Sequence, residues 1–404
     1  MVDIATVDSQ ISQQGQFCLL DWMLDKNFIP YADYESWRYG RISYLDTCFA
    51  LTEEDLLRLI QQAQQSCSEL KLSSEPQEFY PWDSRREPLQ ISRDLQRHQH
   101  LAARWFARRD VPQLDLFMDN SAAIAENQLL DHLANRQFRL AQEALQRLTR
   151  LNPQHARLGG YQDLINYALH CDTQSQIEEE ALAPEVWGLD QEVTPLAREL
   201  LGVKSRDFLA FAWRRLAQNL TQVPFSASEP ELHRSYAYLQ IPDWQALCRC
   251  LEQEAHLYDS PILIARLAQA YLQCQQVNAF YCLWGILFER YAEAGEQMIG
   301  QQGLLTEKWD QFLAFDDEWP AEYFLGFLLI QQPGLLNVLD NLPVLQKAGI
   351  QNPVNRITRD LLHARLTEAD EKPHREALKN ASPVMLSCYL NKRDWFASVK
   401  GRRY

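Results

Sequence analysis

Five basic side chains recur along one stretch of this chain at a spacing that could bind an anion. Residues 92–109 are predicted to form a helix, with Ser92 as its capping residue and an apolar stripe on one side. At about 100° per residue, the basic residues share one narrow sector opposite that stripe. They are Arg93, Arg97, His100, Arg104 and Arg108. Because a guanidinium group binds carboxylate or phosphate through paired hydrogen bonds, these are the predicted partner-binding residues.

The expected ligand of this arginine face is an acidic or phosphorylated segment of a partner protein, with an RNA strand as a further alternative. The same basic face also has a purely structural interpretation. A basic helix face can be solvated, or neutralised by carboxylates of the same protein, here those of residues 178–180 or 316–318. Replacing both Arg97 and Arg104 by Glu distinguishes the two interpretations. If the face binds a partner, the variant should capture that partner more weakly at an unchanged melting temperature. If the arginines have a structural role, the melting temperature should fall.

Residues 372–404 form a second basic segment, in which Trp395 and Phe396 lie among the cations. Aromatic side chains among cations can stack on nucleic acid bases. The favoured interpretation is that Met385 and Tyr389 pack a last helix while the final residues fray in water. The formal net charge of -15 also opposes general affinity for nucleic acid or anionic lipid.

No metal, cofactor or catalytic residue is predicted. Cys248 and Cys250 stand two residues apart in a predicted helix, so they point about 200° from each other and cannot share one ion. His98 and His100 are also two residues apart in a predicted helix, so they cannot share one ion either. The sequence has no phosphate-binding loop, dinucleotide fingerprint, nucleophile elbow or zinc-protease motif. This argues against an enzyme without excluding one, because catalytic carboxylates can come from distant positions.

Composition indicates an all-α protein. With 404 residues, 46% of them hydrophobic, the chain can bury a sizeable core. Glycine is scarce at 14 residues, which favours helices over turn-rich β-sandwiches and barrels. The 9 cysteines are scattered without the regular spacing of a disulfide framework, and the first residues lack a secretory signal pattern. We therefore expect a cytoplasmic protein, without a membrane-spanning segment.

Four regions are expected along the chain. Their predicted bounds are 1–91 for an N-terminal helical region and linker, 92–175 for a helical repeat-like region, 176–330 for a second such region, and 331–404 for a C-terminal helical region with the basic tail. The elements are predicted to be antiparallel helical hairpins stacked as an irregular array or superhelix. An irregular helical bundle is the alternative.

Residues 135–153 carry the clearest helical pattern. Phe138, Ala141, Leu145 and Leu148 recur at steps of three and four, and Asn152-Pro153 stops the helix. This pattern resembles the tetratricopeptide repeat, in which an aromatic residue, a small alanine, two apolar residues and a closing proline occur in that order. The resemblance implies pairs of helices that present a concave groove to a partner protein.

A second match begins at Trp244 and ends at Ser260-Pro261, and the first helix of a following unit fits residues up to Tyr271. The chain departs from the family pattern here, because Cys274 or Gln275 stands where a glycine is expected. No steady 34-residue period is present. The resemblance covers about a third of the chain.

The leading hypothesis is an adaptor, scaffold or dedicated chaperone that presents a helical groove to a partner protein. One alternative is an all-α enzyme, or an accessory subunit of an enzyme complex, with a cavity lined by some of the 16 tyrosines and 11 tryptophans. Another is a nucleic-acid-binding or regulatory protein that uses the basic residues of 92–109. Partner identity and oligomeric state do not follow from the sequence.

Overall fold

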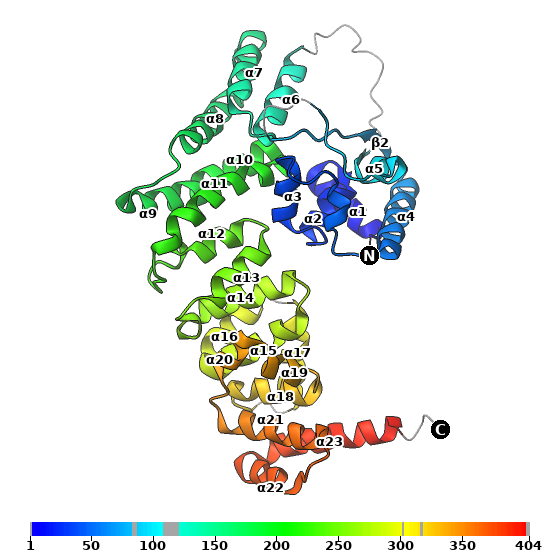
Figure 1. Cartoon of the computed structure of the whole chain (residues 1–404), viewed down its shortest axis with the longest axis vertical. Coiled ribbons are helices and arrows are strands. Elements are labelled where there is room, and N and C mark those ends of the chain that lie inside the picture. Colours follow the sequence, from blue (N-terminus) through cyan, green and yellow to red (C-terminus); the bar gives the residue numbers. More distant parts are fainter. Residues whose placement is uncertain (1, 83–86, 108–120, 301–302, 316–317, 401–404) are drawn as a thin grey trace. The chain divides into compact units, whose positions relative to one another are not determined.

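The computed structural model describes residues 2–82, 87–107, 121–300, 303–315 and 318–400, with side chains up to residue 392. The described residues are mainly helical, in agreement with the all-α class expected from composition (Figure 1). The one addition is a small three-stranded sheet. The repeat family itself stays a prediction.

The chain divides into two compact units, Met1–Trp244 and Gln245–Tyr404. The division falls within the third of the four expected regions. We describe each unit by itself.

The first unit contains helices α1 to α12 and the sheet. Its α-helices are α1 (Ile4–Gln14), α2 (Leu19–Asp25), α3 (Tyr31–Arg38), α4 (Glu53–Glu69), α5 (Leu95–Leu101), α6 (Ser121–Ala134), α7 (Phe138–Leu151), α8 (Leu158–Thr173), α9 (Glu179–Gly188), α10 (Thr194–Leu201), α11 (Ser205–Asn219) and α12 (Arg234–Gln240). A π-helical turn, η3 (Leu189–Val193), joins α9 to α10, and a 3-10 turn, η6 (Pro230–Leu232), precedes α12.

The sheet has the strand order β1-β3-β2, from β1 (Phe17–Cys18), β2 (Ser73–Pro76) and β3 (Ala103–Phe106), and both pairings are antiparallel. The expected helix over 92–109 is therefore wrong in extent. Asp94, not Ser92, caps it by accepting from the Arg97 N–H group, and it ends at Leu101. Residues 103–106 instead form a strand that is paired on both sides.

The prediction was wrong because residues 103–106 pair with strands that are distant in sequence. The spacing of residues within one segment contains no information about such pairing. Trp105 and Phe106 are residues that strands favour, and Trp105 lies opposite Phe17 on one neighbour and Ser74 on the other. Pairing with two strands satisfies more of the backbone hydrogen-bonding groups of residues 103–106 than the fraying end of a helix would. Leu95, assigned by the period to the apolar stripe, is 67% exposed.

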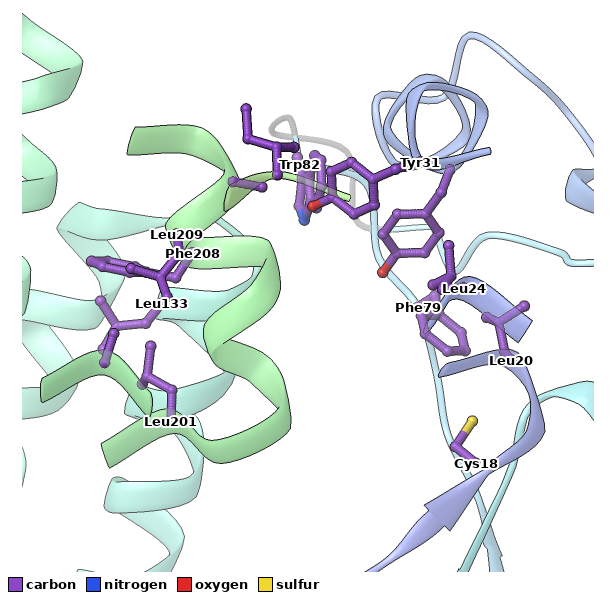
Figure 2. Close-up of a cluster of buried hydrophobic side chains, with 14 of the residues drawn as sticks. Cys18, Leu20, Leu24, Tyr31, Phe79, Trp82, Leu133, Leu201, Phe208 and Leu209 are labelled. Atoms are coloured by element: carbon purple, nitrogen blue, oxygen red, sulfur yellow. The ribbon is translucent and has the colours of Figure 1, made fainter. Parts of the chain in front are cut away.

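The core of the first unit lies among helices α2, α3, α6, α10 and α11 and the loop after β2. Figure 2 shows Leu133, Leu201 and Phe208 gathered in one part of this core, and Tyr31 and Phe79 in another. The burial of Phe79 and of Trp82 shows that the stretch with prolines 76 and 81 is a packed loop rather than a free linker.

Helices α6 and α7 form an antiparallel hairpin, and α8 packs on α7. The predicted stripe of α7 is buried, with Phe138 and Leu145 at 5% and 4% exposure. The hairpin turn places Arg136 at φ 58°, the left-handed region that favours glycine. The Gln137 N–H group then donates to the His132 carbonyl over 2.8 Å, which closes the end of α6.

The second unit is helical throughout its described part. Its α-helices are α13 (Trp244–Glu252), α14 (Pro261–Gln273), α15 (Val277–Arg290), α16 (Ala292–Ile299), α17 (Gly303–Phe315), α18 (Phe324–Gln331), α19 (Leu335–Asn341), α20 (Pro343–Ala348), α21 (Pro353–Leu366), α22 (Lys372–Ala381) and α23 (Pro383–Lys400). Trp244, the first residue of α13, is assigned to the first unit.

Helices α14 and α15 form a hairpin with the same kind of turn as α6 and α7. Gln275 holds φ 60°, so it supplies the conformation for which the repeat family uses glycine. The Gln276 N–H group donates to the Tyr271 carbonyl over 2.8 Å, the counterpart of the contact in the first hairpin. Helix α15 is buried nearly all round, and every residue from Ala279 to Glu289 is buried.

Among the described residues, no helix is long and apolar enough to cross a bilayer.

Candidate functional site

A polar cleft of about 800 Å³ opens in the first unit between the end of β2, the α6–α7 hairpin and the segment that joins α10 to α11. It is lined by Pro76, Gln77, Glu78, Tyr80, Arg104, Gln128, Asp131, His132, Asn135, Gln137, Leu140 and Lys204. A smaller hollow of about 70 Å³ shares Gln77, Arg104 and Asn135 with the cleft and reaches Arg38 and Asp207 beneath it.

The floor beneath the cleft is a buried cluster of arginines and carboxylates. Arg38, at the end of α3, is 4% exposed and Asp207, in α11, is 6% exposed. The Arg38 Nη1 atom donates to Asp207 Oδ2 over 3.2 Å and to the Tyr34 hydroxyl over 2.7 Å. Its Nη2 atom donates to Asn135 Oδ1 in the α6–α7 turn. Arg38 therefore joins α3 and α11 to one wall of the cleft.

Arg136 extends this cluster from the same turn. Its Nη2 atom contacts Glu35 Oε1 at 3.1 Å and also donates to the Asp207 carbonyl over 3.2 Å. Its Nη1 atom donates to the Tyr39 hydroxyl over 2.8 Å. These contacts hold the turn at its left-handed φ angle and bind α6 and α7 to the N-terminal helices.

Two further arginines complete the cluster from α11. Arg206 Nη2 pairs with Asp21 at 2.8 Å, and Arg206 Nη1 with Asp25 at 3.3 Å. Burial raises the pKa of Asp25, although Arg206 opposes that effect. Arg214 lies about two helical turns beyond Arg206 in α11 and pairs with Asp243 at 3.1 Å.

The phenols in the cluster stay protonated and act as hydrogen-bond donors. Burial raises the pKa of Tyr31 and of Tyr34. The Tyr31 hydroxyl donates to Asp207 Oδ1 over 3.2 Å, and the Tyr34 hydroxyl donates to Asp207 Oδ2 over 2.9 Å. Asp207 is thus occupied by two hydroxyls and a guanidinium group. The cluster fixes the floor of the cleft, and its charges are engaged by one another rather than directed at a ligand.

The rim of the cleft differs from its floor because its ion pairs are partly solvated. Arg104 Nη2 lies 3.4 Å from Glu75, with side-chain exposures of 34% and 59%. Lys204 Nζ lies 2.6 Å from Asp131, with exposures of 31% and 58%. Exposed pairs contribute about 0–1 kcal/mol each, so an incoming charged group can replace either partner at small cost.

Further polar side chains line the rim. The His132 Nδ1 atom lies 2.9 Å from Gln137 Oε1. Within the described part of the chain, the buried Oε1 atom of Gln77 has no hydrogen-bond partner. Leu140 adds an apolar surface at 43% exposure. The cleft therefore offers amide donors and acceptors, two exchangeable ion pairs, the Glu78 carboxylate and one apolar contact.

The described members of the predicted partner-binding set do not share one face. Arg93 lies over the Tyr44 ring at 5.0 Å from its centroid. Arg97 pairs with Asp46 at 3.4 Å and also with Glu53. These two arginines are engaged within the N-terminal region, although not by the carboxylates of residues 178–180 that the sequence suggested.

His100 and Arg104 point to different neighbours. The His100 Nδ1 atom lies 2.8 Å from Gln64 Nε2 on α4. Arg104 stands on β3 and lines the cleft, and it is the one described member of the five that does so. Arg108 lies outside the described residues. A strand replaces the second half of the expected helix, and this disperses the set.

Most residues of the cleft and its floor escaped the sequence reasoning, because their partners are distant in sequence. One local signal was available in α11. Two pairs of charges, 206–207 and 214–215, interrupt an otherwise largely apolar run in this helix. A charged patch on a buried helix indicates buried ion pairs.

No metal ligand set is found among the described residues, where no three His, Cys, Asp or Glu side chains are grouped to hold an ion. Cys248 and Cys250 are both buried.

Comparisons of this chain with protein-family models, curated proteins and solved structures gave no match.

Proposed function

We propose that this protein is an interaction adaptor whose polar cleft receives an extended segment of a partner protein. The observation that carries the proposal is the contrast between floor and rim. The floor is held by buried, mutually engaged charges, and the rim presents groups that can exchange partners. A preorganised floor lowers the conformational cost of binding.

The side chains of the rim suit a polypeptide. Gln128, Asn135 and Gln137 carry amides, which both donate and accept hydrogen bonds as a peptide backbone does. Leu140 can contact an apolar side chain of the segment. The proposal keeps the expectation, drawn from the repeat resemblance, that a helical hairpin presents a groove.

The two basic residues of the rim can each bind an acidic residue in that segment. Such a residue would displace Glu75 from Arg104 or Asp131 from Lys204, which gives the guanidinium or ammonium group an equivalent partner. Arg104 is then the part of the predicted arginine face that keeps its proposed role.

Affinity isolation followed by quantitative mass spectrometry tests the proposal. The test protein carries Arg104→Glu with Lys204→Glu. The matched control carries Arg147→Glu with Arg150→Glu, which changes the net charge equally at exposed positions of α7 outside the cleft.

The expected result is a partner captured by the native protein and by the control, and lost from the cleft variant. Capture of the same proteins by all three would contradict the proposal. Circular dichroism melting of each variant establishes that the loss does not come from unfolding.

A further inference from the structure

A second groove of the first unit, with a volume of about 790 Å³, shares no lining residue with the cleft. Its walls are the end of α9, the π-helical turn η3, the 3-10 turn η6 and the start of α12. Val186 and Leu232 give it an apolar base, and Tyr236 closes one side.

Trp187 is the most conspicuous side chain of this groove, because 60% of it is exposed. An indole ring left in solvent is a large apolar surface of the kind that interfaces use. Trp187 lies two residues before the start of η3, and π-helical turns are frequent at functional sites. The ring is thus presented at a local irregularity of the helix.

The groove is acidic around this ring. Asp190, Glu192, Glu229 and Glu231 line it, and no lysine, arginine or histidine does. Within the described ranges, none of these four carboxylates forms an ion pair. The Tyr236 hydroxyl donates to Asp190 Oδ1 over 2.8 Å, which fixes that carboxylate beside the groove.

Such a combination matches one kind of ligand. The face of an indole attracts a cation, and carboxylates around it add Coulomb attraction and accept hydrogen bonds from ammonium or guanidinium groups. A nucleic acid or an anionic lipid would be repelled by the same four carboxylates.

We propose that this groove binds a lysine- or arginine-containing segment of a partner protein, with one cation over Trp187 and others beside the carboxylates. The groove and the cleft are independent surfaces with opposite charge preferences. This inference does not rest on the function proposed for the cleft.

Fluorescence anisotropy with a labelled Ala-Lys-Ala-Arg-Ala-Lys-Ala peptide tests the proposal on the full chain. The native protein should bind this peptide, and raising the salt from about 0.05 M to about 0.3 M should weaken binding. Trp187→Ala should weaken it about tenfold, and Trp187→Phe less, because Trp is the stronger cation–π partner.

Two control variants give the test its specificity. Glu229→Gln with Glu231→Gln should weaken binding, whereas Glu143→Gln with Asp163→Asn, which removes the same charge at exposed positions outside the groove, should not. Arg104→Glu with Lys204→Glu should leave peptide binding intact, which separates this groove from the cleft. Melting curves of the variants should match that of the native protein, because Trp187, Glu229 and Glu231 are exposed.

Two results would overturn the proposal. One is an absence of peptide binding by the native protein. The other is equal weakening by both acidic double variants together with no effect of Trp187→Ala, which would show general attraction to an acidic protein.

Discussion

The guanidinium carbon of Arg136 lies 3.6 Å from the centroid of the Trp82 ring. The contact joins the turn between α6 and α7 to the loop that follows β2. The two residues are 54 positions apart in the sequence. Both segments contribute to the walls of the cleft. Arg136 therefore helps to hold the hairpin turn against the N-terminal part of the unit, together with the contact between Arg38 and Asn135.

Arg136→Ala should destabilise the first unit by about 2 kcal/mol or more, because it removes the ion pair with Glu35, which keeps only Arg214 as its partner, and the contact with Trp82. A urea titration followed by circular dichroism measures the change. Arg139→Ala, an exposed residue of α7, is the control and should change stability by less than about 0.5 kcal/mol. Equal effects of the two substitutions would show that the buried cluster does not hold the turn.

Arg97 and Arg104 should behave differently when each is replaced by Glu. Arg97 is 19% exposed and faces Asp46 and Glu53, so Arg97→Glu brings three carboxylates together and should lower the melting temperature by about 2–4 °C or more. Arg104→Glu affects a more exposed pair and should lower it by less. Thermal melting of the single variants checks this. An unchanged melting temperature for Arg97→Glu would mean that its ion pairs contribute nothing to stability.

His98 should make the stability of the protein depend on pH. Burial lowers the pKa of its imidazole below the ordinary value of 6.5, and its Nδ1 atom accepts a hydrogen bond from the Ile91 N–H group over 3.1 Å. The unfolded chain then binds a proton more readily than the folded chain. The contribution is fully present above about pH 6.5 and is lost as the pH falls through that value toward the lower folded pKa.

Melting temperatures at about pH 8 and about pH 5 test this contribution. In the His98→Asn variant the difference between the two temperatures should be smaller than in the native protein. Gln99→Asn is the control, because it changes an exposed, non-titrating residue near His98, and it should keep the native difference. A native-like pH dependence in His98→Asn would exclude His98 as its source.

Cysteine alkylation should follow burial. Burial raises the pKa of Cys67 to about 12 and that of Cys388 to about 12, so their thiols are protonated and inaccessible in the native protein. Cys48 and Cys274 are only partly buried. Mass spectrometry after iodoacetamide treatment should find these two cysteines modified first, and denaturant should abolish the difference. Rapid native labelling of Cys67 would contradict the burial described for α4.

The parts of the fold that the sequence predicted are those governed by local periodicity. The buried stripe of α7, from Phe138 to Leu148, was predictable, because the spacing of residues along one helix determines which of them share a face. Residues 103–106 were not, because two strands distant in sequence determine their conformation. For these residues the local spacing favours a helix, whereas pairing with distant strands favours a strand, and the strand forms.

Prediction of the candidate site was limited by the same physics. Arg104 was among the predicted binding residues, but its neighbours in the cleft come from three other segments of the first unit. Lys204 and Asp131 form an ion pair across 73 residues, a relationship that no spacing rule contains. The basic character of 92–109 was visible in sequence, and its internal pairing through Asp46 and Glu53 required coordinates.

Site-specific photo-crosslinking from within the cleft tests the central proposal most directly. Leu140 and Leu151 lie on the same helix with exposures of 43% and 42%, and only Leu140 lines the cleft. Each is replaced in turn by benzoylphenylalanine, and the protein is irradiated in the cell that makes it. The account predicts a discrete crosslinked partner from position 140 that is absent from position 151. Identical products from both positions, or none from position 140, would contradict it.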